Sequence, residues 1–269
     1  MNHPVNEFAA LHHAPTPLLL PNAWDHASAS MLAAAGFRSV GTTSLGVAAA
    51  AGQPDGARLT RAETLRVAGS LGGGDFLLSV DAEDGYSDDP AEVADFAREL
   101  AAAGAVGLNL EDGRSDGTLT APELHAAKIA TVKAAVPDLF VNARTDTCWL
   151  DRQHAETLPR LRAYQDAGAD CLFVPGVSDP RRIALLVSEI DLPLNVLFRP
   201  GGPSIAELGG LGVRRVSLGS LLYRVALGAA VATASAVREE RPADECGQGA
   251  PGYAEVQRLA VGAGTTDAG

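Results

Sequence analysis

Two stretches, Phe-Leu-Leu-Ser-Val-Asp-Ala-Glu-Asp-Gly at 76–85 and Val-Gly-Leu-Asn-Leu-Glu-Asp-Gly at 106–113, each join an apolar run to a group of acids. A continuous apolar run of this length that ends in glycine is typical of a β-strand buried on both faces, as in a parallel sheet. We therefore expect Asp81, Glu83 and Glu111 to lie where two such strands end.

These acids predict a metal site. Several carboxylates gathered at strand ends repel one another unless a cation lies among them. Mg²⁺ and Mn²⁺ are the divalent ions that prefer carboxylate and other oxygen ligands. The alternative is that Asp81 or Glu111, taken singly, is an ordinary strand-end acid that caps the next helix.

Strand-like and helix-like segments alternate along the rest of the chain. The expected strands are short and rich in Val, Leu, Ile or Phe, at 17–20, 39–43, 76–81, 106–111, 139–144, 171–175, 193–198 and 214–218. The expected helices follow them, at 25–35, 61–71, 90–103, 121–135, 155–167, 179–189, 203–210 and 219–235. Helix starts are indicated by Asp89-Pro90 and Asp179-Pro180, and Thr60 and Thr120 are further candidate N-caps.

Eight such units predict an α/β fold, a closed (β/α)₈ TIM-type barrel formed by residues 1–238, with a tail or arm at 239–269. An open, doubly wound sheet is the alternative. It usually carries a glycine-rich phosphate loop after its first strand. Here that place holds Pro-Asn-Ala-Trp-Asp at 21–25, which favours the barrel.

Composition narrows the function classes. The chain has 269 residues, 46% of them hydrophobic, and a formal net charge of −12 without a basic stripe, so we expect no nucleic-acid partner. An acidic surface still allows a small anionic substrate if a metal or an arginine reverses the sign inside a pocket. Cys148, Cys171 and Cys246 show no CxxC spacing, which predicts reduced thiols in the cytoplasm. Apolar stretches are interrupted by Gly, Arg or Pro before membrane-spanning length, so no membrane partner is expected.

In a barrel, catalytic groups come from the C-terminal ends of several strands. The chemically active residues at these ends are Thr43, Ser44, Leu45, Asp55, Asp81, Glu83, Glu111, Arg144, Asn195 and Arg199. A metal on the acidic side and a guanidinium beyond it would together hold a small dianion, since the arginine fork suits a carboxylate. Arg144 has an alternative interpretation as half of a structural ion pair with Asp146.

At these positions the chain resembles the isocitrate lyase/phosphoenolpyruvate mutase superfamily, over roughly residues 8–235. The resemblance is carried by Leu-Pro-Asn-Ala-Trp-Asp (20–25), Gly-Thr-Thr-Ser-Leu-Gly-Val (41–47), Pro-Asp-Gly (54–56), Ser-Val-Asp-Ala-Glu-Asp-Gly-Tyr (79–86), Gly-Leu-Asn-Leu-Glu-Asp-Gly (107–113), Val-Asn-Ala-Arg-Thr-Asp (141–146), Phe-Val-Pro-Gly (173–176) and Arg-Val-Ser-Leu-Gly-Ser (215–220).

The resemblance implies a phosphoenolpyruvate/pyruvate-type barrel that uses Mg²⁺ or Mn²⁺, with its last helix swapped between the subunits of a homodimer or homotetramer. It implies that Asp81 ligates the metal directly, that Asp55, Glu83 and Glu111 hold metal-bound waters, and that the shared chemistry passes through a metal-chelated pyruvate enolate. The predicted catalytic residues are Arg144, Glu111 and Asp55. The predicted substrate-binding residues are Thr43, Ser44, Leu45, Asp81, Arg144 and Asn195.

The chain departs from this pattern after the fourth strand. Isocitrate and methylisocitrate lyases of the superfamily carry Lys-Lys-Cys-Gly-His there, whereas residues 111–119 read Glu-Asp-Gly-Arg-Ser-Asp-Gly-Thr-Leu. A lyase that reprotonates carbon from a thiol would lack its acid, but decarboxylation takes its proton from water. The resemblance therefore implies a carbon–carbon lyase acting on a short 2-keto or 2-hydroxy di- or tricarboxylate, by oxaloacetate decarboxylation or a methylisocitrate-lyase-like cleavage.

Two alternatives remain open. One is carbon–phosphorus chemistry on phosphonopyruvate, for which Arg114, Arg144 and Arg199 would supply the basic pocket. The other is a 2-keto-acid-binding protein with little turnover.

Overall fold

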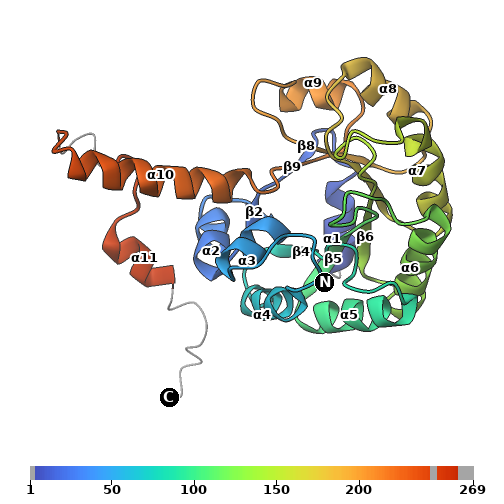
Figure 1. The fold of residues 1–269 in the computed structure, drawn as a ribbon, viewed down its shortest axis with the longest axis horizontal. Coiled ribbons are helices and arrows are strands. Elements are labelled where there is room, and N and C mark those ends of the chain that lie inside the picture. The colour runs from blue at the N-terminus through green and yellow to red at the C-terminus, as the bar shows by residue number, and fades with distance from the viewer. Residues whose placement is uncertain (1–3, 243–246, 260–269) are drawn as a thin grey trace.

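The structure, a computed structural model, describes residues 4–242 and 247–259 and contains a parallel sheet rolled into a barrel (Figure 1). The first strand is divided at Pro21 into β1 (Leu18–Leu20), which pairs with the last strand, and β2 (Asn22–Ala23), which pairs with the next strand along the chain. Proline has no N–H for the ladder, so it interrupts the strand without displacing it. The two halves close the ring, which confirms the predicted barrel.

The other strands agree with the predicted ones to within a residue or two. They are β3 (Ser39–Thr42), β4 (Leu77–Asp81), β5 (Ala105–Glu111), β6 (Phe140–Arg144), β7 (Cys171–Val174), β8 (Leu194–Leu197) and β9 (Arg215–Ser217). The helices are α1 (Pro4–Leu11), α2 (His26–Ala34), α3 (Ser44–Ala50), α4 (Arg61–Leu71), α5 (Pro90–Ala102), α6 (Pro122–Ala135), the 3₁₀ turn η1 (His154–Glu156), α7 (Thr157–Asp166), α8 (Pro180–Ser188), α9 (Ile205–Gly210), α10 (Leu221–Arg238) and α11 (Tyr253–Leu259). Helices α1, α3 and α11 were not predicted from the sequence.

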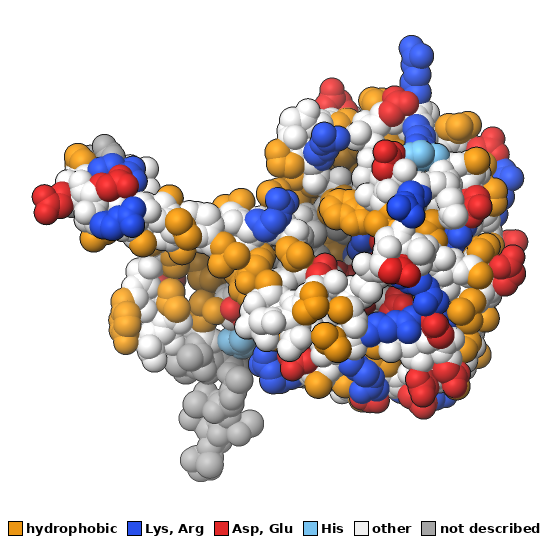
Figure 2. Space-filling view, viewed as in Figure 1, with side chains coloured by type: hydrophobic (Ala, Val, Ile, Leu, Met, Phe, Trp, Pro, Cys, Tyr) orange, Lys and Arg blue, Asp and Glu red, His pale blue; other side chains and the backbone are white. Residues whose placement is uncertain are grey.

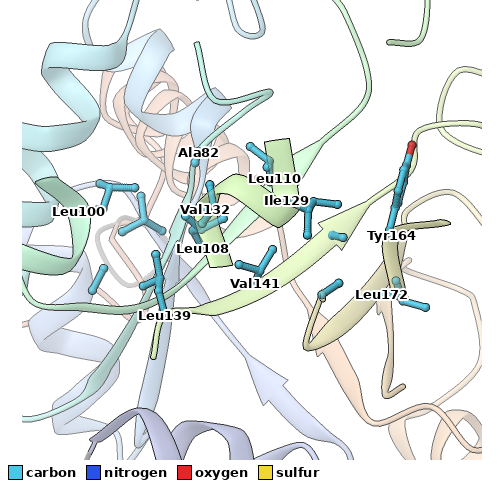
Figure 3. Close-up of a cluster of buried hydrophobic side chains, with 14 of the residues drawn as sticks. Ala82, Leu100, Leu108, Leu110, Ile129, Val132, Leu139, Val141, Tyr164 and Leu172 are labelled. Carbon is cyan, nitrogen blue, oxygen red and sulfur yellow. The ribbon is translucent and has the colours of Figure 1, made fainter. Parts of the chain in front are cut away.

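Side chains alternate along each strand between the outside and the inside of the barrel. In β5, Leu108 and Leu110 belong to the apolar core that packs the sheet against the helices, part of which Figure 3 shows. Asn109, which lies between them, instead lines a cavity at the end of the barrel. In β4, Val80 packs in the same core, whereas Asp81 lines the cavity. The same alternation thus sets the polar side chains of both strands toward one site.

Two of the predicted helix starts are confirmed. The side chains of Asp89 and Asp179 each accept a hydrogen bond from a first-turn amide, with proline at the first helical position. The prediction for Thr120 was wrong, because Ala121 is the N-cap of α6. Thr60 does occupy the N-cap position of α4, but its side chain does not cap the helix; its hydroxyl is used in the site described below.

Helix α10 projects away from the barrel, and α11 lies beneath it (Figure 1). The apolar side chains Val225, Leu227 and Val231 of α10 are 58%, 51% and 68% exposed. Figure 2 shows hydrophobic side chains along the length of α10. With a mean hydropathy of 1.3 over 18 residues, α10 is long and apolar enough to cross a membrane by length and composition alone. Gly, Arg or Pro was expected from the sequence to interrupt every apolar stretch before this length, but α10 continues through Arg224 and Gly228.

The segment predicted as a tail or arm contains α11, which returns to the barrel. His26 Nε2 of α2 lies 3.0 Å from the carbonyl oxygen of Leu259. Cys148 and Cys171 are free thiols, whereas Cys246 lies outside the described residues. The swapping of α10 between subunits stays a prediction.

Candidate active site

A cavity of about 90 Å³ opens at the C-terminal ends of the barrel strands. Six residues predicted for the site line it: Thr43, Ser44, Leu45, Asp55, Asp81 and Arg144. The other predicted residues, Glu83, Glu111, Asn195 and Arg199, are not part of this wall, and their positions are described below.

Asp81 ends β4 and is only 9% exposed. Its Oδ2 accepts a hydrogen bond from the backbone N–H of Ser44 at 3.0 Å, and its own N–H donates to Thr42 Oγ1 at 2.8 Å. Its Oδ1 is buried and has no hydrogen-bond partner among the described residues. A buried carboxylate oxygen without a donor is costly, so the site is complementary to a cation or a donor at this oxygen.

Glu83 follows in a left-handed conformation with φ of 49°, which is uncommon for a non-glycine residue. Its Oε1 accepts hydrogen bonds from Thr60 Oγ1 at 2.7 Å and from the Tyr86 hydroxyl at 3.3 Å, whereas its buried Oε2 lacks a partner within the described chain. Burial raises the pKa of Glu83 to about 7, and the charges of Asp55 and Asp81 contribute while the Thr60 bond opposes the shift. A neutral or metal-compensated carboxyl is therefore favoured here.

Asp55 approaches the cavity from the loop between α3 and α4. The pKa of its carboxyl is raised, first because the surrounding protein displaces water and second because Asp81 is close; a hydrogen bond with the Ser44 side chain opposes the shift. The acids from three neighbouring strand ends thus repel one another, as the sequence predicted.

The described residues contain no group of three carboxylate, histidine or cysteine side chains placed to ligate one ion directly. Mg²⁺ nevertheless binds through one or two carboxylates while it keeps several waters. The unpartnered oxygens of Asp81 and Glu83 fit this type of site. Asp81 would hold the ion directly, and Asp55, Glu83 and Glu111 would hold its waters.

Arg144 ends β6. It lines the cavity, as predicted for a substrate-binding residue, and it also forms the alternative ion pair with Asp146. Its Nε and Nη2 donate to the two carboxylate oxygens of Asp146 at 2.6 and 3.0 Å, and its Nη1 lies 2.5 Å from Glu111 Oε2. Burial by itself would lower the pKa of Arg144, but the charges of Asp146 and Glu111 raise it well above the ordinary value. Within the described residues two of the five guanidinium N–H groups donate hydrogen bonds, both to Asp146, while Nη1 is ion-paired with Glu111; the remaining N–H groups of Nη1 and Nη2 are available to a ligand in the cavity.

Glu111 and its neighbour Asp112 have different surroundings. Burial raises the pKa of Glu111, and the charge of Arg144 opposes that shift. Asp112 is completely buried, and accepts hydrogen bonds from Arg160 Nη1 at 3.0 Å and from the Tyr164 hydroxyl at 2.6 Å. Asp112 therefore joins the barrel to α7, whereas Glu111 belongs to the site.

Asn195 does not line the cavity, so the structure does not support its prediction as a direct substrate contact. It is fully buried, and its side-chain amide donates to Ser217 Oγ at 3.1 Å. Ser217, the last residue of β9, does line the cavity. Asn195 thus supports the wall from behind.

Several residues of the wall were not predicted from the sequence: Asn22, Asn109, Trp149, Phe173, Pro175, Leu197, Ser217, Gly219 and Ser220. Asn22 lies in the Pro-Asn-Ala-Trp segment, and its Oδ1 accepts the N–H groups of Leu218 and Gly219 at 3.0 and 2.8 Å. Asn109 could have been predicted, because residues two positions apart in a strand face the same side and Glu111 was already assigned to the site. No comparable sequence signal marks Trp149.

The loop after β5 forms a short hairpin beside the site, with a bridge between Gly113 and Leu119. Arg114 in this hairpin donates to Asp88 Oδ1 at 2.7 Å, and Arg58 donates to the same oxygen at 2.6 Å. Arg58 comes from the loop that carries Asp55. One carboxylate thus connects the hairpin with the Asp55 loop.

Fold and site together define a TIM-type barrel with an acidic cavity at the C-terminal ends of its strands, and comparison with known proteins identifies the family. The sequence model of the phosphoenolpyruvate phosphomutase family matches residues 8–238. The chain belongs to this family, whose members include lyases that act on carbon–carbon bonds.

Individual relatives agree with this assignment. An uncharacterized protein of Mycobacterium tuberculosis is 46% identical over 94% of this chain and 96% of its own length. An oxaloacetate decarboxylase of Ectopseudomonas mendocina is 33% identical over 72% of this chain and 69% of its own length. A 2-methylisocitrate lyase of Bacillus subtilis is 31% identical over 70% of this chain and 64% of its own length. A solved structure from Burkholderia cenocepacia J2315, described as a lyase/mutase, is 36% identical over 96% of both chains, with a TM-score of 0.87.

Proposed function

We propose that this protein is a Mg²⁺- or Mn²⁺-dependent lyase that cleaves a carbon–carbon bond of a short 2-keto or 2-hydroxy di- or tricarboxylate. The observation that carries the proposal is the Asp81 carboxylate, which ends β4 in the cavity wall with one buried oxygen unpartnered in the described chain. A divalent ion bound there would stabilise the negative charge that develops on the substrate as the bond breaks.

The protein's own residues would supply the remaining functions. The N–H groups of Arg144 that make no hydrogen bond within the described residues would hold a substrate carboxylate, and its ion pairs with Glu111 and Asp146 fix the direction of the fork. The N-terminal turn of α3, at Ser44 and Leu45, lines the same cavity and would face another carboxylate. The Ser44 amide is partly committed, because it donates to Asp81.

The experiment compares the wild type, Asp81→Asn and the exposed control Asp138→Asn. Each is incubated with Mg²⁺ or EDTA and with oxaloacetate, 2-methylisocitrate or phosphonopyruvate, and products are followed by NMR. We expect metal-dependent pyruvate from a carbon substrate, and at least about a hundredfold loss in Asp81→Asn, the scale of a single electrostatic contact in catalysis. Metal-dependent turnover that survives in Asp81→Asn would contradict the proposal, and phosphate release from phosphonopyruvate would move the protein to carbon–phosphorus chemistry.

One observation favours a second candidate, a 2-keto-acid-binding protein with little turnover. Among the described residues, the cavity wall contains no lysine, histidine or cysteine that would donate a proton to carbon. Decarboxylation needs no such group, since water supplies the proton. Tight binding of pyruvate without any product from the substrates above would support the binding protein.

We propose that α10 joins the subunits of a homo-oligomer. Its exposed apolar side chains form a surface that a second copy of the chain would cover in a homodimer or homotetramer. The proposed location is the cytoplasm, supported by the free thiols Cys148 and Cys171.

A further inference from the structure

A second cavity, of about 360 Å³, adjoins the one that contains Asp81. Trp149, Leu197 and Ser220 line both cavities, so these residues form their common border. We call the cavity that contains Asp81 the inner cavity, and the cavity between the loop after β8 and the start of α10 the outer cavity. A ligand held in the inner cavity can extend into the outer one.

The two volumes suit different parts of a ligand. Ligand pockets usually measure about 300–1,000 Å³. The inner cavity, at about 90 Å³, is well below that range, whereas the outer cavity at about 360 Å³ falls within it. The inner cavity therefore accommodates the keto-acid head of a molecule whose larger part lies outside it.

The outer cavity is apolar and positively charged. Trp149, Phe198 and Leu221 form apolar parts of its wall, and Trp149 is 55% exposed, which is unusual for a large apolar side chain without a partner. The charged side chains in this wall are Arg199 and Arg224, and it contains no acid. Neither guanidinium makes a hydrogen bond or ion pair within residues 4–242 and 247–259, so both are available for a ligand.

The inner cavity differs in that Asp55 and Asp81 line it beside Arg144, and these two acids favour a bound cation. A ligand that satisfies both cavities carries a metal-binding keto- or hydroxy-acid head, an apolar middle and an anionic end. Arginine recognises a carboxylate through paired N–H groups, which suits this end.

We propose that the outer cavity binds the distal half of the substrate, and that this half is a carbon chain or branch ending in a carboxylate that Arg199 and Arg224 hold. This inference rests on the proposed lyase function and narrows its substrate to acids larger than oxaloacetate. Oxaloacetate has only two carbons between its carboxylates, so it fills the inner cavity and leaves both arginines without a partner.

The test uses two probes of different reach. Oxalate carries a metal-binding head and nothing more, whereas 2-methylisocitrate adds a methyl branch and distal carboxylates. Their dissociation constants are measured by calorimetry with saturating Mg²⁺ for the wild type, Arg199→Gln, Arg224→Gln and the double variant. Arg66→Gln, an exposed arginine on α4 outside both cavities, is the matched control.

We expect each single variant to weaken 2-methylisocitrate about tenfold, and the double variant about a hundredfold, as for lost hydrogen bonds to a charged group. Oxalate binding should stay unchanged, as should both affinities in the control. Equal affinity of wild type and double variant for 2-methylisocitrate would overturn the inference, as would an equal loss for oxalate. If the wild type binds oxalate but not the larger acid, the inference fails and the lyase proposal stands; if it binds neither, both fail.

Discussion

Replacement of Glu83 by glutamine should stabilise the metal-free protein at neutral and higher pH. Glu83 is 2% exposed, and one of its carboxylate oxygens has no hydrogen-bond partner in the described chain. Glutamine keeps an oxygen that can accept the hydrogen bond from Thr60, which is 2.7 Å long. The substitution therefore removes the buried charge and retains most of the local packing.

The size of the effect follows from the pKa of Glu83, which burial raises from 4.5 to about 7 in the folded protein. The folded state holds this proton more tightly than the unfolded chain does, so stability falls as pH rises between these two values. At about 1.4 kcal/mol for each pH unit, the loss at pH 8 is on the order of 3 kcal/mol, and it is absent below about pH 4.5. The variant does not experience this loss.

The assay is thermal unfolding of wild type, Glu83→Gln and the exposed control Glu123→Gln, in EDTA, at about pH 5 and about pH 8. For a chain of this size about 1 kcal/mol corresponds to 2–4 °C, so Glu83→Gln should melt roughly 6–12 °C above the wild type at the higher pH. At the lower pH the difference should be small. Saturating Mg²⁺ should stabilise the wild type more than the variant. A difference that is the same at both pH values would refute the reasoning.

Three further changes test other parts of the structure. Arg144→Gln should destabilise the protein by about 3–5 kcal/mol in denaturant unfolding, because it leaves Glu111 and Asp146 buried without their cation; a loss below about 1 kcal/mol would show that this ion pair does not matter for folding. Asp88→Asn should speed hydrogen exchange in the 113–119 hairpin with less than about 1 kcal/mol change in stability, because this half-exposed carboxylate joins the hairpin to the Asp55 loop; unchanged exchange would contradict that connection. Val231→Glu should reduce the molar mass measured by light scattering, because it places a charge on the apolar face of α10; an unchanged mass would exclude that face from the assembly.

The fold was predictable because its signals are local. Short apolar runs, aspartate–proline helix starts and the acids at strand ends each act within a few residues, and the barrel follows from their repetition. The exceptions depend on contacts distant in sequence. Thr60 has the sequence position of a helix cap, but its hydroxyl donates to Glu83, 23 residues later.

The sequence was sufficient to predict which strand ends form the candidate site, but not which side chains line its cavity. The sequence placed Asp81 and Arg144 at the correct end of the barrel, and both line the cavity. It also placed Asn195 there, although this side chain is buried behind Ser217. A strand end brings a residue close to the mouth of a barrel, but neighbouring side chains decide whether it reaches the cavity.

The sequence by itself determined the element order, the closed barrel and the gathering of acids that calls for a cation. Tertiary structure alone decided between neighbours of the same chemistry. Glu111 and Asp112 are adjacent acids, yet one pairs with Arg144 at the site and the other with Arg160 of α7. The physical reason is that Glu111 ends β5 with its side chain toward the site, whereas Asp112 follows directly and its side chain meets α7. Each acid therefore pairs with an arginine from a different, distant part of the chain.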